Sequence, residues 1–193
     1  MQQQFYQIEP GIPADTNELE RLYDMLNESL SRGVNYPGWK KGLYPIRETA
    51  ETGIRKHTLF VARTQGRIAG TVILNHEPES AYAGANWTIE AEDKEVFVVH
   101  TLAVHPDFQQ AGVGRALIEF SKQLAQQKGM KAVRLDVRSG NLPALRLYES
   151  CGFRYVQTVD LGLNLPGLVW FDLYEYNLGQ RSSAESVGKP SIP

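Results

Sequence analysis

The sequence predicts a single α/β domain, and three observations support this fold class. The chain has 193 residues, of which 42% are hydrophobic and 22% charged, so it can bury one sizeable core. Segments with the spacing of strands and of helices alternate along it. The central segment 96–104 carries large apolar or β-branched residues at both its odd and its even positions, which is typical of a strand covered on both faces.

The N-terminal part predicts a short strand followed by two helices. Phe5–Glu9 is expected to form the strand, because the Pro and Gly residues after it stop a ladder. Asp15 or Thr16 would cap a helix whose leucines repeat at helical spacing until Gly33. A second helix is expected over Ile46–Lys56, because its acids come early and its bases late, the favourable order for the helix dipole.

Two loops of this half are candidates to surround a binding site. Residues 34–45 are rich in Pro and Gly and carry Tyr36, Trp39 and Tyr44, so these aromatics could line an acceptor pocket or form a small core. Glu77–Lys94 is expected to be a long surface excursion and a candidate lid, because loops of this length are commonly functional or disordered.

The central strand 96–104 is expected to end at His105-Pro106, since proline cannot donate to a ladder. A helix then runs from about Val113 to Gly129 with apolar residues at helical spacing. Gly112 and Gly114 stand at its start, where unpaired N–H groups and the positive end of the helix dipole point outward together. We therefore predict a pyrophosphate site here, although the glycine spacing is neither that of a Walker A loop nor that of a dinucleotide fingerprint.

The remaining segments complete the alternation of strands and helices. Two hairpins are expected, one through the tight turn at Gln65-Gly66 and one through residues 162–167. From Gly179 onward the composition cannot bury apolar area, so 179–193 is predicted to be a disordered tail. The expected strands are Thr58–Arg63, Arg67–Asn75, Lys131–Val137, Phe153–Leu161 and Val169–Asn177, and the last helix is expected over Asn141–Cys151.

Two segments resemble a known family. Gln109–Gly114 reads Q-x-x-G-x-G after Leu102–Pro106, and this resembles the acetyl-coenzyme A signature of the GCN5-related N-acetyltransferase (GNAT) superfamily. Asn141–Phe153 resembles the N-x-x-A-x-x-x-Y-x-x-x-G-F helix of the same superfamily. The resemblance implies one domain over residues 3–178, with a mixed, mostly antiparallel sheet of six to seven strands, splayed central strands and flanking helices.

The resemblance also implies acetyl-CoA as cofactor and names the residues that would bind it. Backbone groups of the central strand would hold the carbonyl and the cofactor arm, and the glycine turn would hold the pyrophosphate. The implied cofactor-binding residues are Leu102, Ala103, Val104, Gln109, Gln110, Ala111, Gly112, Val113, Gly114, Arg115, Asn141, Ala144 and Tyr148.

Two side chains are candidates for catalysis. By the resemblance, Tyr148 is the partner of the departing thiolate, either as a full proton donor or through a hydrogen bond; the alternative is a buried tyrosine that packs its helix on the sheet. His100 is a candidate general base, because a neutral imidazole accepts a proton near pH 7 and strand alternation would put it on the same side as Leu102. A core histidine bonded to a backbone carbonyl is the alternative for His100.

The expected activity is transfer of an acetyl group to the primary amine of a small molecule, directly within a ternary complex, since no activated nucleophile is visible. A protein or peptide acceptor and a non-catalytic acyl-CoA sensor remain alternatives. The net charge of −2 gives no case for nucleic acid, and no apolar run predicts a membrane span, so a cytoplasmic protein is expected. Cys151 stands alone, without the spacing of a metal site. The family is often dimeric, so a homodimer is the expected assembly.

Overall fold

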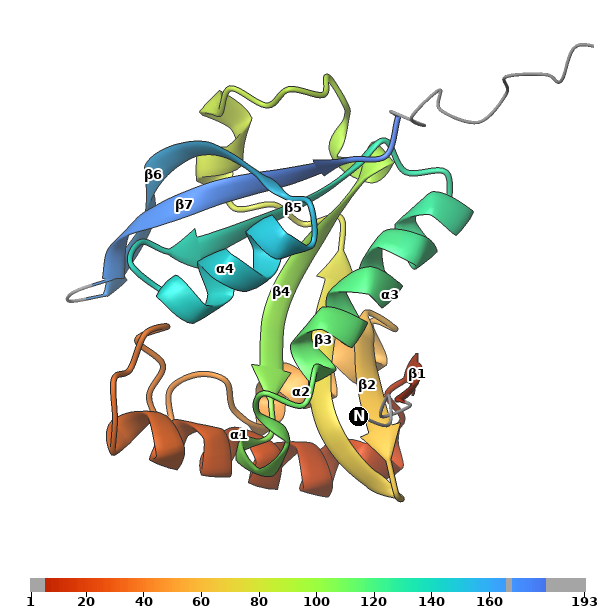
Figure 1. Ribbon diagram of the computed structural model, residues 1–193, viewed down its shortest axis with the longest axis vertical. Coiled ribbons are helices and arrows are strands. Elements are labelled where there is room, and N and C mark those ends of the chain that lie inside the picture. Colours follow the sequence, from red (N-terminus) through yellow and green to blue (C-terminus); the bar gives the residue numbers. More distant parts are fainter. Residues whose placement is uncertain (1–5, 166–167, 180–193) are drawn as a thin grey trace, which may run out of the picture.

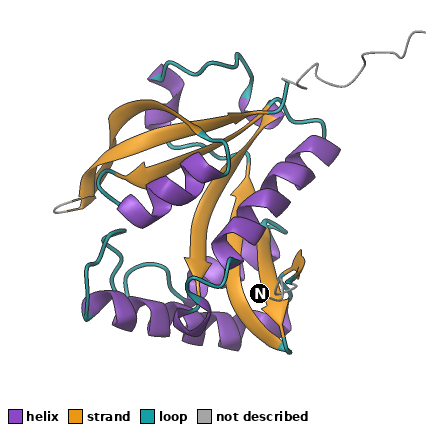
Figure 2. Ribbon diagram, in the orientation of Figure 1, coloured by secondary structure: helices purple, strands orange, loops and turns teal. Residues whose placement is uncertain are grey.

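The computed structural model describes residues 6–165 and 168–179, which form a seven-stranded sheet with helices on both faces (Figures 1 and 2). The strand order is β1-β2-β3-β4-β5-β7-β6, and every neighbouring pair is antiparallel except β4 and β5. The mixed, mostly antiparallel sheet is therefore confirmed. The elements are β1 (Gln7–Pro10), α1 (Thr16–Ser31), α2 (Arg47–Arg55), β2 (Leu59–Thr64), β3 (Arg67–Asn75), β4 (Val96–Val104), α3 (Val113–Gln127), β5 (Ala132–Arg138), α4 (Leu142–Ser150), β6 (Arg154–Leu165) and β7 (Leu168–Asn177).

The helices divide between the two faces of the sheet. In Figure 1, α3 and α4 lie in front of the strands, and α2 lies behind them. The apolar side of α3 packs with Phe97 and Val99 of β4 in one core. The leucines of α1 pack with Ile54 of α2 and Val61 of β2 in a second core. The sheet is thus buried on both sides, which explains the two-parity apolar pattern of its central strand.

Strands β4 and β5 are paired over only part of their length. Parallel pairs join Val96–Val99 to the first residues of β5, the last pair being Val99 with Leu135. Beyond this point β4 continues to Val104 and β5 to Arg138, and Figure 1 shows the two strands diverging. The expected splay of the central strands is therefore confirmed, and it leaves backbone groups of both strands without a strand partner.

A β-bulge in β4 reverses the alternation of its side chains. Thr101 has a φ of 47°, and the pairing register with β3 shifts next to it. Before the bulge Val99 faces the α3 core, but after it Leu102 faces that same core. Alternation from Val98 therefore puts His100 on the opposite face, and the prediction that His100 shares a side with Leu102 is wrong, because one extra residue changes the parity.

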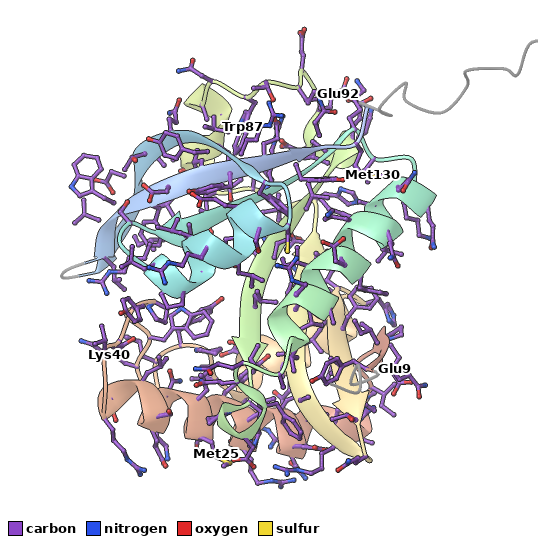
Figure 3. The ribbon with its side chains drawn as sticks, in the orientation of Figure 1. Glu9, Met25, Lys40, Trp87, Glu92 and Met130 are labelled. Carbon is purple, nitrogen blue, oxygen red and sulfur yellow. The ribbon has the colours of Figure 1, made fainter. Side chains whose placement is uncertain are left out.

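The Glu77–Lys94 segment lies on the surface as expected, and it also packs on the sheet through its aromatic residues. A role as a lid stays a prediction. Tyr82, from the 3-10 helix Ser80–Gly84, is only 3% exposed and packs against Phe171 and Leu173 of β7. Trp87 lies over the same part of the sheet (Figure 3). The aromatic residues of the segment bury themselves on β5 and β7, and this burial keeps the segment in place.

The closing hairpin differs from the prediction. Strand β6 continues to Leu165 and β7 begins at Leu168, so residues 162–165 extend the ladder where a loop was expected. Phe5 and the predicted tail after Gly179 lie outside the described residues. Within those residues, no helix is both long and apolar enough to span a bilayer.

Candidate functional site

The turn before α3 presents free backbone N–H groups. Gly112 is the N-cap with a φ of 86°, and Gln110 before it has a φ of 61°. The first helical hydrogen bond runs from Ala116 N–H to Gly112 O, so the N–H groups of residues 112–115 have no partner within the helix. A Cβ at Gly112 would meet nothing within 4 Å. The turn therefore offers open space and several donors to an anion, as the sequence predicted.

The two glycines of this turn have different physical roles. At Gly114 a Cβ would come within 3.1 Å of Leu147 Cδ2, so this glycine lets α3 approach α4. Gly70 of β3, which the sequence did not single out, has a similar role: its Cβ would stand 2.8 Å from Ala103 O. The space beside Gly112 is open, whereas the missing side chain of Gly114 serves helix packing and its backbone N–H stays among the free donors. Ligand binding by either glycine stays a prediction.

The neighbouring residues of the turn are fixed by side chains. The Tyr6 hydroxyl donates to Ala111 O at 2.8 Å and so ties the N-terminus to the turn. The Arg115 guanidinium donates to the carbonyl and hydroxyl oxygens of Ser150 at the end of α4. The side chain of Arg115 is thus used in packing α3 on α4, and its backbone N–H remains for a ligand.

Helix α4 presents Tyr148 as expected. Asn141 caps the helix by accepting from Ala144 N–H at 3.4 Å. Tyr148 is 6% exposed, and its hydroxyl makes no hydrogen bond to any described residue. Burial raises its pKa, and the nearby Asp136 carboxylate raises it further. The phenol therefore keeps its proton and can donate it to an incoming ligand atom.

Beyond the last β4–β5 pair, one edge of β4 is free. Ala103 and Val104 pair with Thr71 and Gly70 of β3. On the β5 side the same stretch has no strand partner. The predicted cofactor-binding stretch Leu102–Val104 thus lies where backbone donors remain available, and it leads toward Gln109 and the α3 turn.

His100 lies behind this edge and is held by a side chain. Its Nε2 is 3.0 Å from Asn75 Oδ1, which also accepts from Glu77 N–H. Because Oδ1 is an acceptor, it favours a proton on Nε2. Burial lowers the pKa of His100, and a backbone hydrogen bond with Glu77 raises it in part, so the imidazole is neutral at pH 7. The ring thus has both a side-chain and a backbone partner, and its role as a base or as a core histidine stays a prediction.

Asp136 is a functional candidate that the sequence analysis missed. It lies on β5, one residue beyond the last pair with β4, and its carboxylate accepts from Tyr82 O–H at 2.9 Å. Burial raises the pKa of Asp136 to about 6. In addition to burial, the charge of Asp136 raises the pKa of both Tyr44 and Tyr148. A loop, a strand and a helix therefore meet around this carboxylate. An acid between Leu135 and Val137 within a predicted strand was the available signal.

The loop between α1 and α2 also lies close to Asp136. The Tyr44 hydroxyl is hydrogen-bonded to Thr101 Oγ1 at the β4 bulge, and the Trp39 and Tyr44 rings meet edge to face at 5.7 Å. Trp39 also packs against the α1 core. The aromatics of this loop therefore form a small core that also contacts Thr101 of β4. Lining of an acceptor pocket stays a prediction.

The remaining histidines and the cysteine are structural. His105 is 6% exposed and its ring accepts from Asp107 N–H, which shapes the turn after β4. His76 is exposed and bonds Val96 O through its ring. Cys151 is buried, and burial raises the pKa of its thiol, which disfavours the reactive thiolate.

Comparison with known families supports the assignment that these features suggest. The profile of the Acetyltransferase (GNAT) family matches residues 19–153, from α1 to the end of the Tyr148 motif. The chain belongs to the GNAT family. Members of this family generally use acetyl-CoA. The open N–H groups at Gly112 and the free edge of β4 fit a pyrophosphate and its attached arm.

GNAT relatives match the chain over part of its length. An uncharacterized N-acetyltransferase of Methanocaldococcus jannaschii is 31% identical over 100 residues, 52% of this chain and 40% of that protein. The [ribosomal protein bS18]-alanine N-acetyltransferase of Escherichia coli is 44% identical over 52 residues, 27% of this chain and 35% of that enzyme. The matches thus span less than half of these relatives' own lengths.

Solved structures agree with the GNAT fold over most of the chain. A GNAT acetyltransferase from Streptococcus agalactiae has a TM-score of 0.74 at 16% identity, covering 91% of this chain and 96% of that one. The ribosomal-protein-S18-alanine N-acetyltransferase of Escherichia coli has a TM-score of 0.65 at 17% identity, covering 93% and 98%. At these identities the likeness concerns the fold alone.

Proposed function

We propose that this chain transfers the acetyl group of acetyl-CoA to the primary amine of a small molecule, directly within a ternary complex. One observation carries the proposal: where β4 and β5 diverge, the charge of Asp136 on β5 reaches Tyr148 on α4 and adds to burial in raising its pKa. Asp136 is suited to accept a proton and Tyr148 to donate a hydrogen bond. Acyl transfer from a thioester to an amine needs both.

The backbone supplies the binding groups for the cofactor. The N–H groups of residues 112–115 would hold the pyrophosphate, and the free edge of β4 at Leu102–Val104 would lie along the arm. The amide side chain of Asn141, whose oxygen caps α4, can donate to the arm from the other side. Bound acetyl-CoA supplies an acetyl group activated as a thioester.

Asp136 would act as the general base. An amine arrives as an ammonium ion at pH 7 and must lose a proton before its nitrogen can form a bond to the acetyl carbon. With a pKa near 6, Asp136 is mostly ionised at pH 7, so it can take this proton, and its basicity lies close to the working pH. His100 is the second candidate, because burial keeps its ring neutral at pH 7 and a neutral imidazole can accept a proton.

Tyr148 and the β4 backbone would stabilise the charge that develops during transfer. Free N–H groups of β4 donate to the carbonyl oxygen as it gains charge. The Tyr148 hydroxyl donates to the sulfur as the carbon–sulfur bond breaks; its raised pKa favours a hydrogen bond over complete proton loss. The ammonium gives up two protons in all. One ends on the sulfur of coenzyme A, and the other is released.

A protein amine is the second candidate acceptor. The sequence match to the bS18-alanine N-acetyltransferase favours it, since that enzyme is named for an alanine of a ribosomal protein. A small molecule is favoured by the loop between α1 and α2, which contacts both β4 and β5 beside the site. A relative named mycothiol acetyltransferase, from Propionibacterium freudenreichii, is consistent with a small acceptor and is 34% identical over 106 residues.

Release of free thiol from acetyl-CoA across a panel of amines and N-terminal peptides tests the proposal. Small amines should react, and Tyr148→Phe and Asp136→Asn should slow the reaction by about 10²- to 10⁴-fold. His100→Ala should have a smaller effect. Tyr155→Phe and Asp160→Asn, which change exposed residues of β6, are matched controls. Tight coenzyme A binding with no turnover on any amine would instead identify a sensor.

A further inference from the structure

The loop between α1 and α2 crosses from one side of the β4–β5 divergence to the other. We call residues 35–45 of this loop the strap. At its C-terminal end the Tyr44 hydroxyl bonds Thr101 Oγ1 on β4, and Asn27 Nδ2 of α1 donates to the carbonyls of Tyr44 and Pro45, each at 3.3 Å. This end is therefore attached both to the bulged strand and to α1.

The N-terminal end of the strap is attached to β5 by Arg138. Its Nη1 donates to Asn35 O at 3.1 Å and to Tyr36 O at 3.2 Å. Within the described residues the Arg138 guanidinium makes no ion pair with a carboxylate, so these two carbonyls are the partners of a full charge. Hydrogen bonds with a charged donor are roughly twice as strong as neutral ones.

The middle of the strap is pressed against β7 and stiffened by its own bonds. A Cβ on Gly38 would come within 2.4 Å of Leu168 Cδ2, so the backbone lies directly on that side chain. The Asn35 side chain accepts from Gly38 N–H and donates to Trp39 O, at 2.9 and 2.7 Å. The strap is thus a small rigid unit, and Figure 1 shows it rising from the end of α1.

The position of the strap decides how an acceptor can approach. The anion-binding turn and Tyr148 belong to α3 and α4, on one face of the sheet. In the proposed ternary complex the cofactor arm fills the approach from the α3–α4 face. The amine therefore has to enter from the opposite face of the sheet. On that face the strap extends from Thr101 to Arg138 beside Asp136, so it limits the width of the group that bears the amine.

We infer that Arg138 is a positioning residue that selects acceptors: by holding the strap across the divergence, it favours amines on a slender, unbranched arm over bulky ones. This inference rests on the proposed function, because it concerns the acceptor side of the same site. The inference does not involve the residues that would bind the cofactor or those that would move protons. Substitution of Arg138 should therefore affect the KM of the amine and leave the KM of acetyl-CoA unchanged.

Limited proteolysis tests the strap without any acceptor. Lys40 and Lys41 are exposed trypsin sites within the strap, and Figure 3 shows Lys40 pointing away from the protein. Arg138→Ala should speed cleavage at these two lysines about tenfold, because the two bonds that hold one end are lost. Arg21→Ala is the matched control: Arg21 is exposed on α1 and makes no hydrogen bond or ion pair with described residues.

Acceptor selectivity tests the consequence. Acetylation of hexylamine and of adamantylamine is measured for wild type, Arg138→Ala and Arg21→Ala. Arg138→Ala should raise the rate ratio of bulky to slender amine, and the KM for hexylamine, about tenfold each. The KM for acetyl-CoA should stay within about twofold of wild type.

The outcomes separate this inference from the proposed function. An unchanged amine ratio in Arg138→Ala overturns the inference, even where cleavage at Lys40 or Lys41 increases. If wild type acetylates no amine, the proposed function fails, and proteolysis alone still decides whether Arg138 holds the strap. Should Arg138→Ala not fold, Gly38→Ala decides: its new methyl group pushes against Leu168 without changing any charge, and the same two shifts are expected.

Discussion

Strand β5 carries three charged side chains at alternate positions, and each has a different use. Arg134 pairs with Glu175 at 3.0 Å, Asp136 accepts from Tyr82, and Arg138 holds two carbonyls of the strap. Alternation places all three on the face opposite α3 and α4. The two arginines pair with other groups, and burial raises the pKa of Asp136 although the Tyr82 hydrogen bond opposes this. A carboxylate in this state is a good proton acceptor near neutral pH.

The pKa of Asp136 predicts the pH dependence of the transfer. The rate should rise with pH through about 6, because the ionised form accepts the proton and the protonated form cannot. The Tyr82 hydrogen bond lowers this pKa, so Tyr82→Phe should move the rise to higher pH. A pH profile of kcat/KM measures both. A profile that keeps its midpoint in Tyr82→Phe would show that another group, such as His100, is the base.

Gly112 should matter for coenzyme A binding in addition to the cost that its positive φ would impose on any other residue. Gly112→Ala places a methyl group in the open space of the anion site, and a positive φ costs an alanine roughly 1–2 kcal/mol. We expect about a tenfold weaker Kd for coenzyme A by calorimetry. Gly66→Ala is the control, since Gly66 also has a positive φ and open space but lies in the β2–β3 turn. Equal coenzyme A affinities in the two variants would contradict the assigned anion site.

At the scale of elements, contacts between α3 and α4 position Tyr148, the proposed partner of the thiolate. The carbonyls at the end of α4 receive Arg115 and Lys122 from α3, with Lys122 Nζ 2.9 Å from Cys151 O. Cations at a helix C-terminus satisfy free carbonyls and oppose the dipole. Helix α3 therefore fixes both the anion-binding turn at its own start and the orientation of α4, which carries Tyr148.

The 77–94 segment is held by a buried ion pair. Glu175 is 3% exposed and Arg134 is 5% exposed. Glu175 also accepts from the N–H groups of Thr88 and Ile89, and the Arg134 guanidinium stacks on Trp87 at 4.3 Å. With these bonds the pair is nearly fully satisfied, and it joins the segment that carries Tyr82 to β5 and β7.

Breaking this pair should be costly. Arg134→Met leaves Glu175 buried without its cation, so the free energy of unfolding should fall by about 3–5 kcal/mol. Chemical denaturation measures it. Arg47→Met removes a half-exposed arginine that bonds Glu20 and Glu51, and it should reduce the free energy of unfolding far less. Similar losses in the two variants would mean that the Arg134 pair contributes no more than a surface pair.

At the scale of the whole molecule, the sheet is continuous across its seven strands, and β4 and β5 diverge within it. The strands lie side by side from β1 at one edge to β6 at the other, and only the β4–β5 pair is parallel. The proposed pyrophosphate turn, Tyr148 and Asp136 belong to α3, α4 and β5. A ligand bound between β4 and β5 would join the two halves of the sheet.

Coenzyme A should therefore stabilise the entire domain. At a concentration of about 100 times Kd, binding adds about 2.7 kcal/mol to the free energy of unfolding. For a domain of this size the expected rise in Tm is about 5–10 °C, measurable by calorimetry. Pantetheine, which lacks the pyrophosphate, should give a much smaller shift at the same concentration. An equal shift with pantetheine would show that the α3 turn contributes little to binding.

Much of the fold and part of the site could be predicted from the sequence, because the signals involved are local. Apolar spacing located α1, α3 and the central strand, and Asn141 and Gly112 marked helix starts through their own caps. The anion-binding turn and the buried Tyr148 lie where their motifs predicted. Their catalytic and binding roles stay predictions until they are measured.

The tertiary structure decided what depends on segments far apart in the chain. The bulge at Thr101, seen in the pairing with β3, turned His100 away from Leu102. Tyr82, whose burial on β7 no local pattern reveals, shapes the pKa of Asp136. Leu147 explains Gly114, and Arg138 fixes the strap. A local sequence pattern indicates how its own segment folds. A pKa, a β-bulge or a close approach of two backbones depends instead on the distant segment that packs there.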